Sequence, residues 1–187
     1  MIIVKDIQAL WHQTPVVARK FLIKGFLLLL LWQIINIGYL EPHRIFDGTI
    51  TNFTTVTIVK VLEQFYTTGS FTYQALSHDA RVLYNGQSVF RISDACNALS
   101  VFVDFAIFII VYPNSVGRKI NFIVLGAISI FLMNVLRCVL LATLYISHST
   151  SVNVMHHYVF STIVYAFVLF LWIIFTRKKS VTADAAI

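Results

Sequence analysis

The segment FLIKGFLLLLLWQIINIGYL (residues 21–40) decides the fold class of this chain. Its only charged residue is Lys24, and a helix of about 20 apolar residues is long enough to cross the hydrocarbon core of a bilayer. The rest of the chain has the same character, because 58% of the 187 residues are hydrophobic and 12% are charged, against roughly 25% charged residues in soluble domains. We therefore expect a membrane protein that forms a single domain over residues 1–187.

Three more segments have the composition of membrane spans. They are CNALSVFVDFAIFIIVY (96–112), which is short, INFIVLGAISIFLMNVLRCVLLATLYI (120–146), and HHYVFSTIVYAFVLFLWIIF (156–175). Backbone polar groups inside lipid must be hydrogen-bonded within the segment, so these spans are predicted to be helices. The predicted fold is an all-α polytopic membrane protein with about four transmembrane helices.

The basic residues predict how these spans are oriented. Nine of them flank one set of span ends, and four are spread over the long segment between the first two spans; the nine are Lys5, Arg19, Lys20, Lys24, Arg118, Lys119, Arg177, Lys178 and Lys179, and the four are Arg44, Lys60, Arg81 and Arg91. Lys and Arg near span ends favour the cytoplasmic side. We expect a multi-pass protein of the cell membrane with both termini and the 113–119 turn in the cytoplasm, and with residues 41–95 and 147–155 outside.

The long outer segment, residues 41–95, is predicted to be structured. In TITNFTTVTIVKVLEQFYTTGS (49–70), apolar residues from Phe53 to Tyr66 recur at helical spacing. This spacing predicts an amphipathic helix that lies on the membrane or over the bundle, although threonines and other β-branched residues weaken the prediction. In RVLYNGQSVFRIS (81–93), two alternating runs flank Asn85-Gly86, a strong hairpin signal. We expect this β-hairpin to lead the chain directly to Cys96.

Three chemically reactive types of side chain are predicted to meet at the outer leaflet. Cys96 begins the second span, and His156 and His157 begin the fourth. Arg137 lies in the third span, within about one turn of its expected outer end. Asn134 precedes Arg137 by one helical turn and can orient it or form a hydrogen bond across helices. Ionisable groups within spans are costly, so this group is a candidate functional site.

A thiol, an imidazole and a guanidinium supply the groups that acyl transfer needs. The thiolate is the form that attacks a carbonyl carbon, and the imidazole transfers protons near neutral pH. The guanidinium stays charged, so it can bind the oxyanion that develops or a carboxylate of the substrate. This combination predicts a reaction through a covalent thioester on Cys96.

The same residues also have other interpretations. Asp104, inside the second span, can form an intramembrane ion pair with Arg137, and the chain is then a non-catalytic membrane protein such as a transporter subunit or an assembly factor. A thiol–disulfide carrier is a third interpretation, and it needs Cys138 close to Cys96. The chain has no CxxC pair, and Cys138 is expected to face elsewhere and to be structural.

The composition argues against several other classes of function. The net charge of +6 comes from basic residues beside apolar runs, so it does not indicate a nucleic-acid partner. The two cysteines and six histidines show no metal-ligand spacing, and we expect no metal site and no cofactor.

Three short motifs resemble a known family when they are taken in order. DACNALSVF (94–102), NVLRCVLL (134–141) and HHYVFSTIVYAFVLFLW (156–172) place a Cys, an Asn-x-x-Arg and a His at successive span ends. This pattern resembles the exosortase/archaeosortase family, and in particular its short forms with one compact membrane module. The resemblance covers about residues 80 to 175, and the first half of the chain matches only in general layout.

The resemblance implies a membrane-embedded cysteine transpeptidase or protease. Such enzymes are thought to cleave C-terminal sorting tails of exported proteins, which consist of a short motif, an apolar helix and a basic end, and to transfer the protein to a membrane or surface acceptor. It implies that Cys96 is the nucleophile, that Arg137 binds the oxyanion or positions the substrate, and that His156, in preference to His157, transfers protons. Asn97 and Asn134 match polar family positions and are expected to support the site.

The chain departs from the family pattern in two respects. Long family members have about eight spans, whereas about four are predicted here, so the chain is either a minimal enzyme or needs a partner subunit. Ser100 stands where many relatives carry a basic residue after the Cys motif. This second difference bears on how a substrate is recognised.

Overall fold

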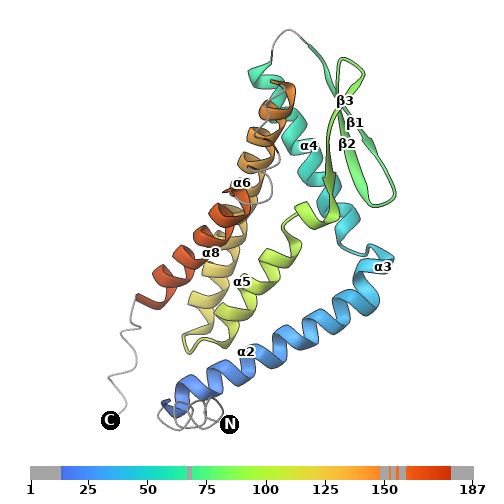
Figure 1. The fold of residues 1–187 in the computed structure, drawn as a ribbon. Coiled ribbons are helices and arrows are strands. Elements are labelled where there is room, and N and C mark those ends of the chain that lie inside the picture. The colour runs from blue at the N-terminus through green and yellow to red at the C-terminus, as the bar shows by residue number, and fades with distance from the viewer. Residues whose placement is uncertain (1–13, 67–68, 148–151, 153–154, 156–158, 178–187) are drawn as a thin grey trace, which may run out of the picture.

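The computed structural model describes residues 14–66, 69–147, 152, 155 and 159–177, and these are mostly helical with one small sheet. Three of the described helices are long and apolar enough to cross a membrane, namely Val16–His43, Val116–Ile146 and Phe160–Arg177. The mostly helical fold predicted from the sequence is therefore confirmed. In Figure 1, the start of α2 and the end of α8 lie at the same end of the molecule.

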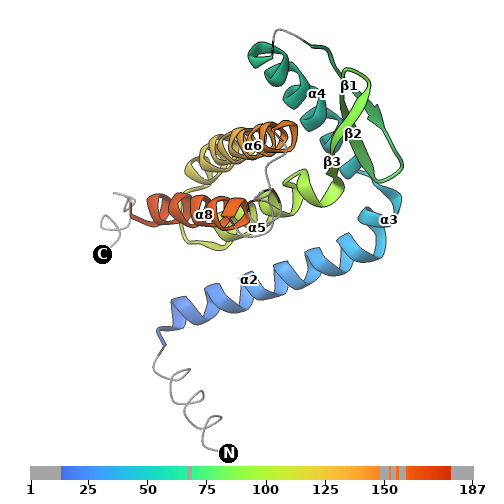
Figure 2. The ribbon, with the colours of Figure 1, turned by 45° about the horizontal axis from the view of Figure 1, so that its top comes forward.

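The first span is longer than predicted. Helix α2 (Val16–Ile35) continues through a π-helical turn, η1 (Asn36–Leu40), into the short helix α3 (Glu41–His43). The apolar run begins at residue 21, but the helix begins directly after Pro15, because Arg19 and Lys20 are themselves good helix formers. None of the α2 residues is buried, and α2 runs beside α5 (Figure 2).

The second predicted span is replaced by a shorter helix. Helix α5 (Leu99–Val111) has 13 residues, so it is about 20 Å long at 1.5 Å per residue, and it is not one of the three helices that are long enough to cross a membrane. The residues from Cys96 to Ala98 were predicted to belong to this span, and they do not. Cys96 ends a one-turn 3₁₀ helix, η2 (Asp94–Cys96), and Ala98 has a φ of 66°, which interrupts the helix before Leu99.

Helix α6 (Val116–Ile146) is the central element of the fold. It contacts α4, α5, α8 (Phe160–Arg177) and β3, and it begins four residues before the predicted start at residue 120. Against α5 and α8 it packs a core cluster whose fully buried members include Phe105, Ile109, Ile130 and Phe175. Gly126 faces the Phe105 ring, which a Cβ at this position would overlap.

We expect Gly126→Ala to lower the free energy of unfolding. A Cβ atom at residue 126 would overlap the ring of Phe105, which is fully buried and has no space to move into, and overpacking of this kind costs roughly 1–3 kcal/mol. Gly117→Ala, on the same helix, is the matched control, because its Cβ would meet nothing within 4 Å. Denaturation in detergent measures both variants, and equal stability of the two would contradict the packing described here.

The predicted amphipathic helix is present as α4 (Asp47–Phe65). Its buried face agrees with the predicted one in part: Val59 and Leu62 are buried against α6 and the sheet as predicted, together with Ile58 and three threonines. Phe53 and Phe65, which were assigned to the apolar face, are 62% and 73% exposed. The helix forms in spite of its β-branched residues because its packing outweighs their weak helix propensity.

The predicted hairpin is confirmed, and a third strand extends it. Strands β2 (Asp79–Tyr84) and β3 (Gln87–Ser93) pair antiparallel on either side of Asn85 and Gly86, which both have positive φ, as a two-residue hairpin turn requires. Strand β1 (Phe71–Ala75) was not predicted, and it pairs with β2 to give the order β1-β2-β3. The sheet lies beside α4 (Figure 1) and buries Val82 and Ile92 against it.

Candidate functional site

Cys96 lies at the point where the small sheet joins the helical bundle. Strand β3 ends at Ser93, and η2 then turns the chain so that Cys96 faces α6 rather than continuing into α5. Its thiol is free and partly exposed. The nucleophile predicted from the sequence is therefore held in a turn between two elements and not within a membrane helix.

Helix α6 brings Arg137 and Asn134 to this turn. A guanidinium nitrogen of Arg137 (Nη2) lies 3.6 Å from the Cys96 Sγ atom, and Asn134 Nδ2 donates a 3.0 Å hydrogen bond to the backbone carbonyl of Cys96. The Asn134 Oδ1 atom accepts a hydrogen bond of 3.5 Å from Arg137 Nη1. Three of the residues singled out in the sequence, from two distant segments, are thus in direct contact.

Arg137 has unused hydrogen-bonding capacity. A guanidinium has five N–H groups in a fixed plane and keeps its charge at all ordinary pH values. Among the described residues, the buried Nε of Arg137 has no acceptor. The side chain can therefore contact Cys96 and still donate to a further oxygen, such as a carbonyl that is gaining negative charge.

A cavity of about 240 Å³ opens beside this group. Cys96, Arg137 and Cys138 line it, and its other walls come from β3 and the end of α6: Phe90, Arg91, Ile92, Leu141 and Tyr145. The expectation that Cys138 faces elsewhere is therefore wrong. Cys138 is 3% exposed and belongs to the core, but the cavity covers a wide strip of α6, so two consecutive residues both reach it.

An ion pair holds the residue two positions before Cys96. The carboxylate of Asp94 accepts hydrogen bonds of 2.8 Å from both Nε and Nη2 of Arg44, and Thr51 donates a third of 2.7 Å. Arg44 also donates to the carbonyls of Leu76 and Ser77, in the turn that joins β1 to β2. The pKa of the Arg44 guanidinium is raised above its ordinary value, mainly by its hydrogen bond with Asp94, so the guanidinium stays charged.

A second set of bonds holds the residue after Cys96. Asn97 is 1% exposed, and its Nδ2 donates to Asp47 at 2.8 Å and to Thr51 at 3.2 Å. Its Oδ1 accepts from the backbone N–H of Leu99 at 2.8 Å. These bonds fix the backbone on both sides of Ala98, whose left-handed conformation is otherwise unfavourable for a residue other than glycine. Asn97 was predicted to support the site, and in the structure it does so through hydrogen bonds to Asp47, Thr51 and the backbone of Leu99.

We expect Arg44→Ala to reduce stability. The side chains of the Arg44–Asp94 pair are 23% and 17% exposed, and loss of a hydrogen bond to a charged group that stays partly buried costs roughly 1–3 kcal/mol. Arg91→Ala is the control, because its 3.3 Å pair with Asp79 has a 62% exposed arginine and is expected to contribute less than about 1 kcal/mol. Denaturation midpoints in detergent compare the two variants. If Arg44→Ala lowered stability no more than Arg91→Ala does, the Arg44–Asp94 ion pair would not stabilise the fold.

Not all of the predicted site residues are brought together. His156 and His157 lie outside the described residues. Asp104 is in the second turn of α5 and lines a different cavity, between α2, α5 and α8. Among the described residues Asp104 and Arg137 form no ion pair, and Arg137 contacts Asn134 and Cys96 instead. The predicted intramembrane pair is therefore absent from the structure.

The sequence did not reveal the residues that hold the Cys96 turn in place. Arg44, Asp47 and Thr51 precede it by about 50 positions, and no periodicity links the two segments. Their one visible signal is composition, since charged and hydroxyl residues gather at 44–51 in a chain with few charges. A polar cluster of this kind between apolar segments needs buried partners.

No family model, curated protein or solved structure matches this chain. Within the described ranges, no group of three or more His, Cys, Asp and Glu side chains is placed so that it could hold a metal ion.

Proposed function

We propose that this chain is a membrane-embedded cysteine peptidase or transpeptidase of the exosortase/archaeosortase type. It cleaves the C-terminal sorting tails of exported proteins and transfers them to a surface or membrane acceptor. The observation that supports this proposal best is the contact of Cys96 Sγ with Arg137 Nη2 beside a cavity. A nucleophile, a permanent cation and a space for a substrate then occur at one place.

In the proposed reaction, Cys96 attacks the scissile carbonyl carbon of the tail. Its thiol proton passes to His156 or, in its place, to His157, and Arg137 binds the oxyanion that forms. Collapse of this intermediate breaks the C–N bond, the histidine protonates the leaving amine, and a thioester on Cys96 remains. An acceptor amine or water then attacks the thioester, gives its proton to the histidine, and regenerates the thiol.

The substrate tail is proposed to reach Cys96 from the lipid. A narrow apolar cavity of about 140 Å³ between α6 and α8 is lined by Leu136, Arg137, Leu140, Phe160 and Val164, with two further residues, Met133 and Ile163. Arg137 lines this cavity as well as the cavity beside Cys96. An apolar helix that lies along α6 and α8 would bring the residues beyond its end to the Cys96 cavity.

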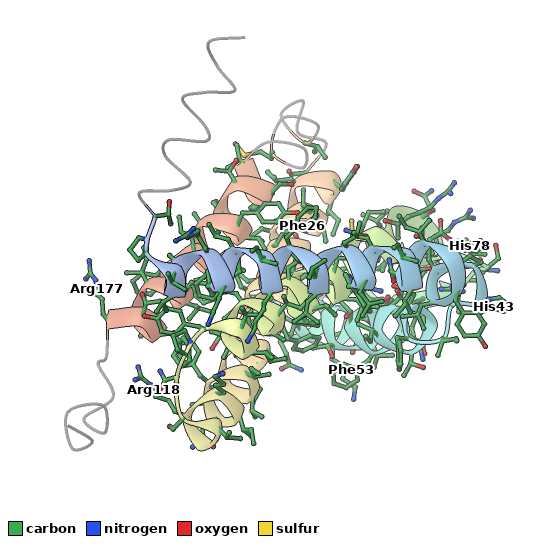
Figure 3. All side chains as sticks on the ribbon, turned by 90° about the horizontal axis from the view of Figure 1, so that it is seen from below. Phe26, His43, Phe53, His78, Arg118 and Arg177 are labelled. Carbon is green, nitrogen blue, oxygen red and sulfur yellow. The ribbon has the colours of Figure 1, made fainter. Side chains whose placement is uncertain are left out.

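The proposed orientation has the site on the outer side of the cell membrane. Figure 3 shows Arg118 and Arg177 at one end of the molecule, and His43 and His78 at the other. Basic residues at span ends favour the cytoplasm, so the end that carries Arg118 and Arg177 is assigned there. In this arrangement α5 and the turn before it cross the membrane as a fourth, short segment. A partner subunit that covers the exposed α2 helix is compatible with this arrangement.

A thiol–disulfide carrier is a second candidate, because both free cysteines line one cavity. It would need Cys138 as much as Cys96, since each disulfide exchange uses both sulfurs. The non-catalytic alternative was based on an Arg137–Asp104 pair, and among the described residues this pair is not formed.

A reporter protein tests the proposal directly. It carries a C-terminal tail with a short motif, an apolar helix and a basic end, and it is expressed with and without this chain. The intact mass of the exported reporter is then measured. The proposal predicts a loss of tail mass only when the chain is present, and equal masses across a panel of motifs would contradict it.

A further inference from the structure

A second cavity lies between α2, α5 and α8, and it shares no lining residue with the cavity beside Cys96. Its volume is about 410 Å³, which falls within the usual range for sites that bind small molecules. Four aromatic rings and one carboxyl group stand out in its otherwise aliphatic wall: Phe21, Phe26, Phe108, Trp172 and Asp104. Figure 3 shows Phe26 on α2, at the side of the molecule where α8 also lies.

Asp104 is the feature of this cavity that needs a partner. The residue is partly buried, and in the described part of the chain no hydrogen bond or ion pair reaches its carboxyl group. A carboxylate among apolar walls at membrane depth is unfavourable unless a cation or a hydrogen-bond donor compensates it. The proposed reaction at Cys96 makes no use of this residue.

The aromatic rings are arranged around the same space. Phe108 stacks on Trp172 with ring centroids 4.4 Å apart, and Phe21 meets Phe108 edge-on at 5.4 Å. Ring faces attract ammonium groups, and this attraction is stronger where water is excluded. Aromatic walls with a single carboxyl group therefore favour a positively charged ligand over a neutral or a negative one.

Trp172 offers a second polar contact. Its indole N–H is buried, and within the described residues it has no acceptor. A buried donor without a partner is costly, so an oxygen atom of a ligand would satisfy it. Gly25 also lines the cavity, and a Cβ there would meet nothing within 4 Å, so the wall on the α2 side leaves room for a ligand.

We propose that this cavity binds a small amine that partitions into the membrane. Its protonated ammonium group pairs with Asp104, its apolar body lies against the aromatic rings, and an oxygen, where the ligand has one, accepts from Trp172. A complete transmembrane helix, roughly 10–12 Å across, is too wide for a cavity of this volume. The binding is independent of the reaction proposed at Cys96, and it stands or falls on its own measurement.

Photo-crosslinking to the full chain in uncharged maltoside micelles tests this site. The probes are a twelve-carbon alkylamine and the alkyl alcohol of the same length, each with a diazirine, and the labelled peptides are mapped by mass spectrometry. We expect the amine to label peptides of α2, α5 or α8 at a concentration at least about tenfold lower than the alcohol does. Asp104→Asn should raise the half-saturating amine concentration at least about tenfold and leave the alcohol unchanged.

Two further variants complete the experiment. Glu63→Gln removes an exposed carboxylate of α4 and should label as the unmodified chain does, whereas Trp172→Phe keeps the ring stack and should weaken amine labelling a few-fold. Equal labelling by amine and alcohol, or no effect of Asp104→Asn in a folded variant, would overturn the proposal. If Asp104→Asn does not fold, the comparison of amine with alcohol in the unmodified chain decides alone.

Discussion

Cys96→Ala is expected to reduce tail cleavage to the uncatalysed background, a loss of roughly 10⁴-fold or more, as is usual when a nucleophile is removed. Alanine cannot form the thioester. It fills most of the volume of the partly exposed cysteine, so the fold is expected to stay intact. The measurement is the fraction of tail-bearing reporter cleaved per unit of folded enzyme. The variant removes the sulfur and keeps the hydrogen bond from Asn134, because that bond is to the backbone carbonyl of residue 96.

Cys138→Ala is the matched control for this experiment. Cys138 lines the same cavity and is 3% exposed, so its loss removes a small buried group and is expected to lower stability by about 1 kcal/mol without stopping cleavage. Cleavage that continues in Cys96→Ala would contradict the peptidase proposal. Equal loss of activity in both folded variants would favour the thiol–disulfide carrier instead.

Arg137→Gln is expected to lower the cleavage rate by roughly 10²- to 10³-fold, the usual effect of removing a group that binds a developing oxyanion. Arg137 is the cation in contact with the Cys96 sulfur, and glutamine is shorter and uncharged. Arg137→Lys keeps the charge but loses the planar guanidinium, so it should retain part of the activity. The measurement is kcat for the reporter, and the stability of the folded variant is measured in parallel. Little loss of stability is expected, because the 3.5 Å bond from Arg137 to Asn134 contributes little.

Arg118→Gln provides the control on the same helix. Arg118 lies near the other end of α6, where it donates to the Phe175 carbonyl at 2.8 Å and packs over the Phe175 ring. Its loss should affect stability and leave kcat unchanged. If Arg137→Gln kept kcat within a few-fold of the unmodified chain, Arg137 would have no role in the proposed reaction.

The sequence was sufficient to predict that Cys96 and Arg137 lie close together, whereas the bond from Asn134 to the Cys96 carbonyl is seen only in the structure. Cys96 begins one apolar segment and Arg137 lies toward the end of another, and the expected lengths of the spans predicted that these two positions meet. The hairpin was predictable for a similar reason, since Asn85 and Gly86 favour positive φ and therefore determine the turn locally. The hairpin prediction succeeds because it depends only on local composition, whereas Cys96 reaches Arg137 through a turn rather than as part of a span.

The interruption between Cys96 and α5 was not predictable from the same pattern. CNALSVFVDF is apolar enough to continue as one helix, and Ala98 favours helices rather than a left-handed turn. The turn exists because Asn97 bonds to Asp47 and Thr51 on α4. Those partners are about 50 residues away along the chain, and only the folded structure brings them together.

The threonines of α4 were misleading for a related reason. β-Branched residues lower helix propensity, yet Thr55 donates to the Thr51 carbonyl one turn earlier at 2.7 Å, and both are buried in the packed face. Of the apolar side chains that marked the predicted face, Val59 and Leu62 are buried, whereas Phe53 and Phe65 remain exposed. The period of the pattern was correct, but the buried side of the helix is determined by the sheet and by α6.

The most direct test of the proposed function is the detection of a thioester on Cys96. The purified chain is mixed with a tail-bearing substrate, quenched in acid within the turnover time, and digested for mass spectrometry. The proposal predicts that the peptide with Cys96 carries the N-terminal product of the substrate, that neutral hydroxylamine removes it, and that Cys96→Ala lacks it. Cleavage of the tail with no adduct, or with the adduct on another residue, would contradict the proposal that Cys96 is the nucleophile.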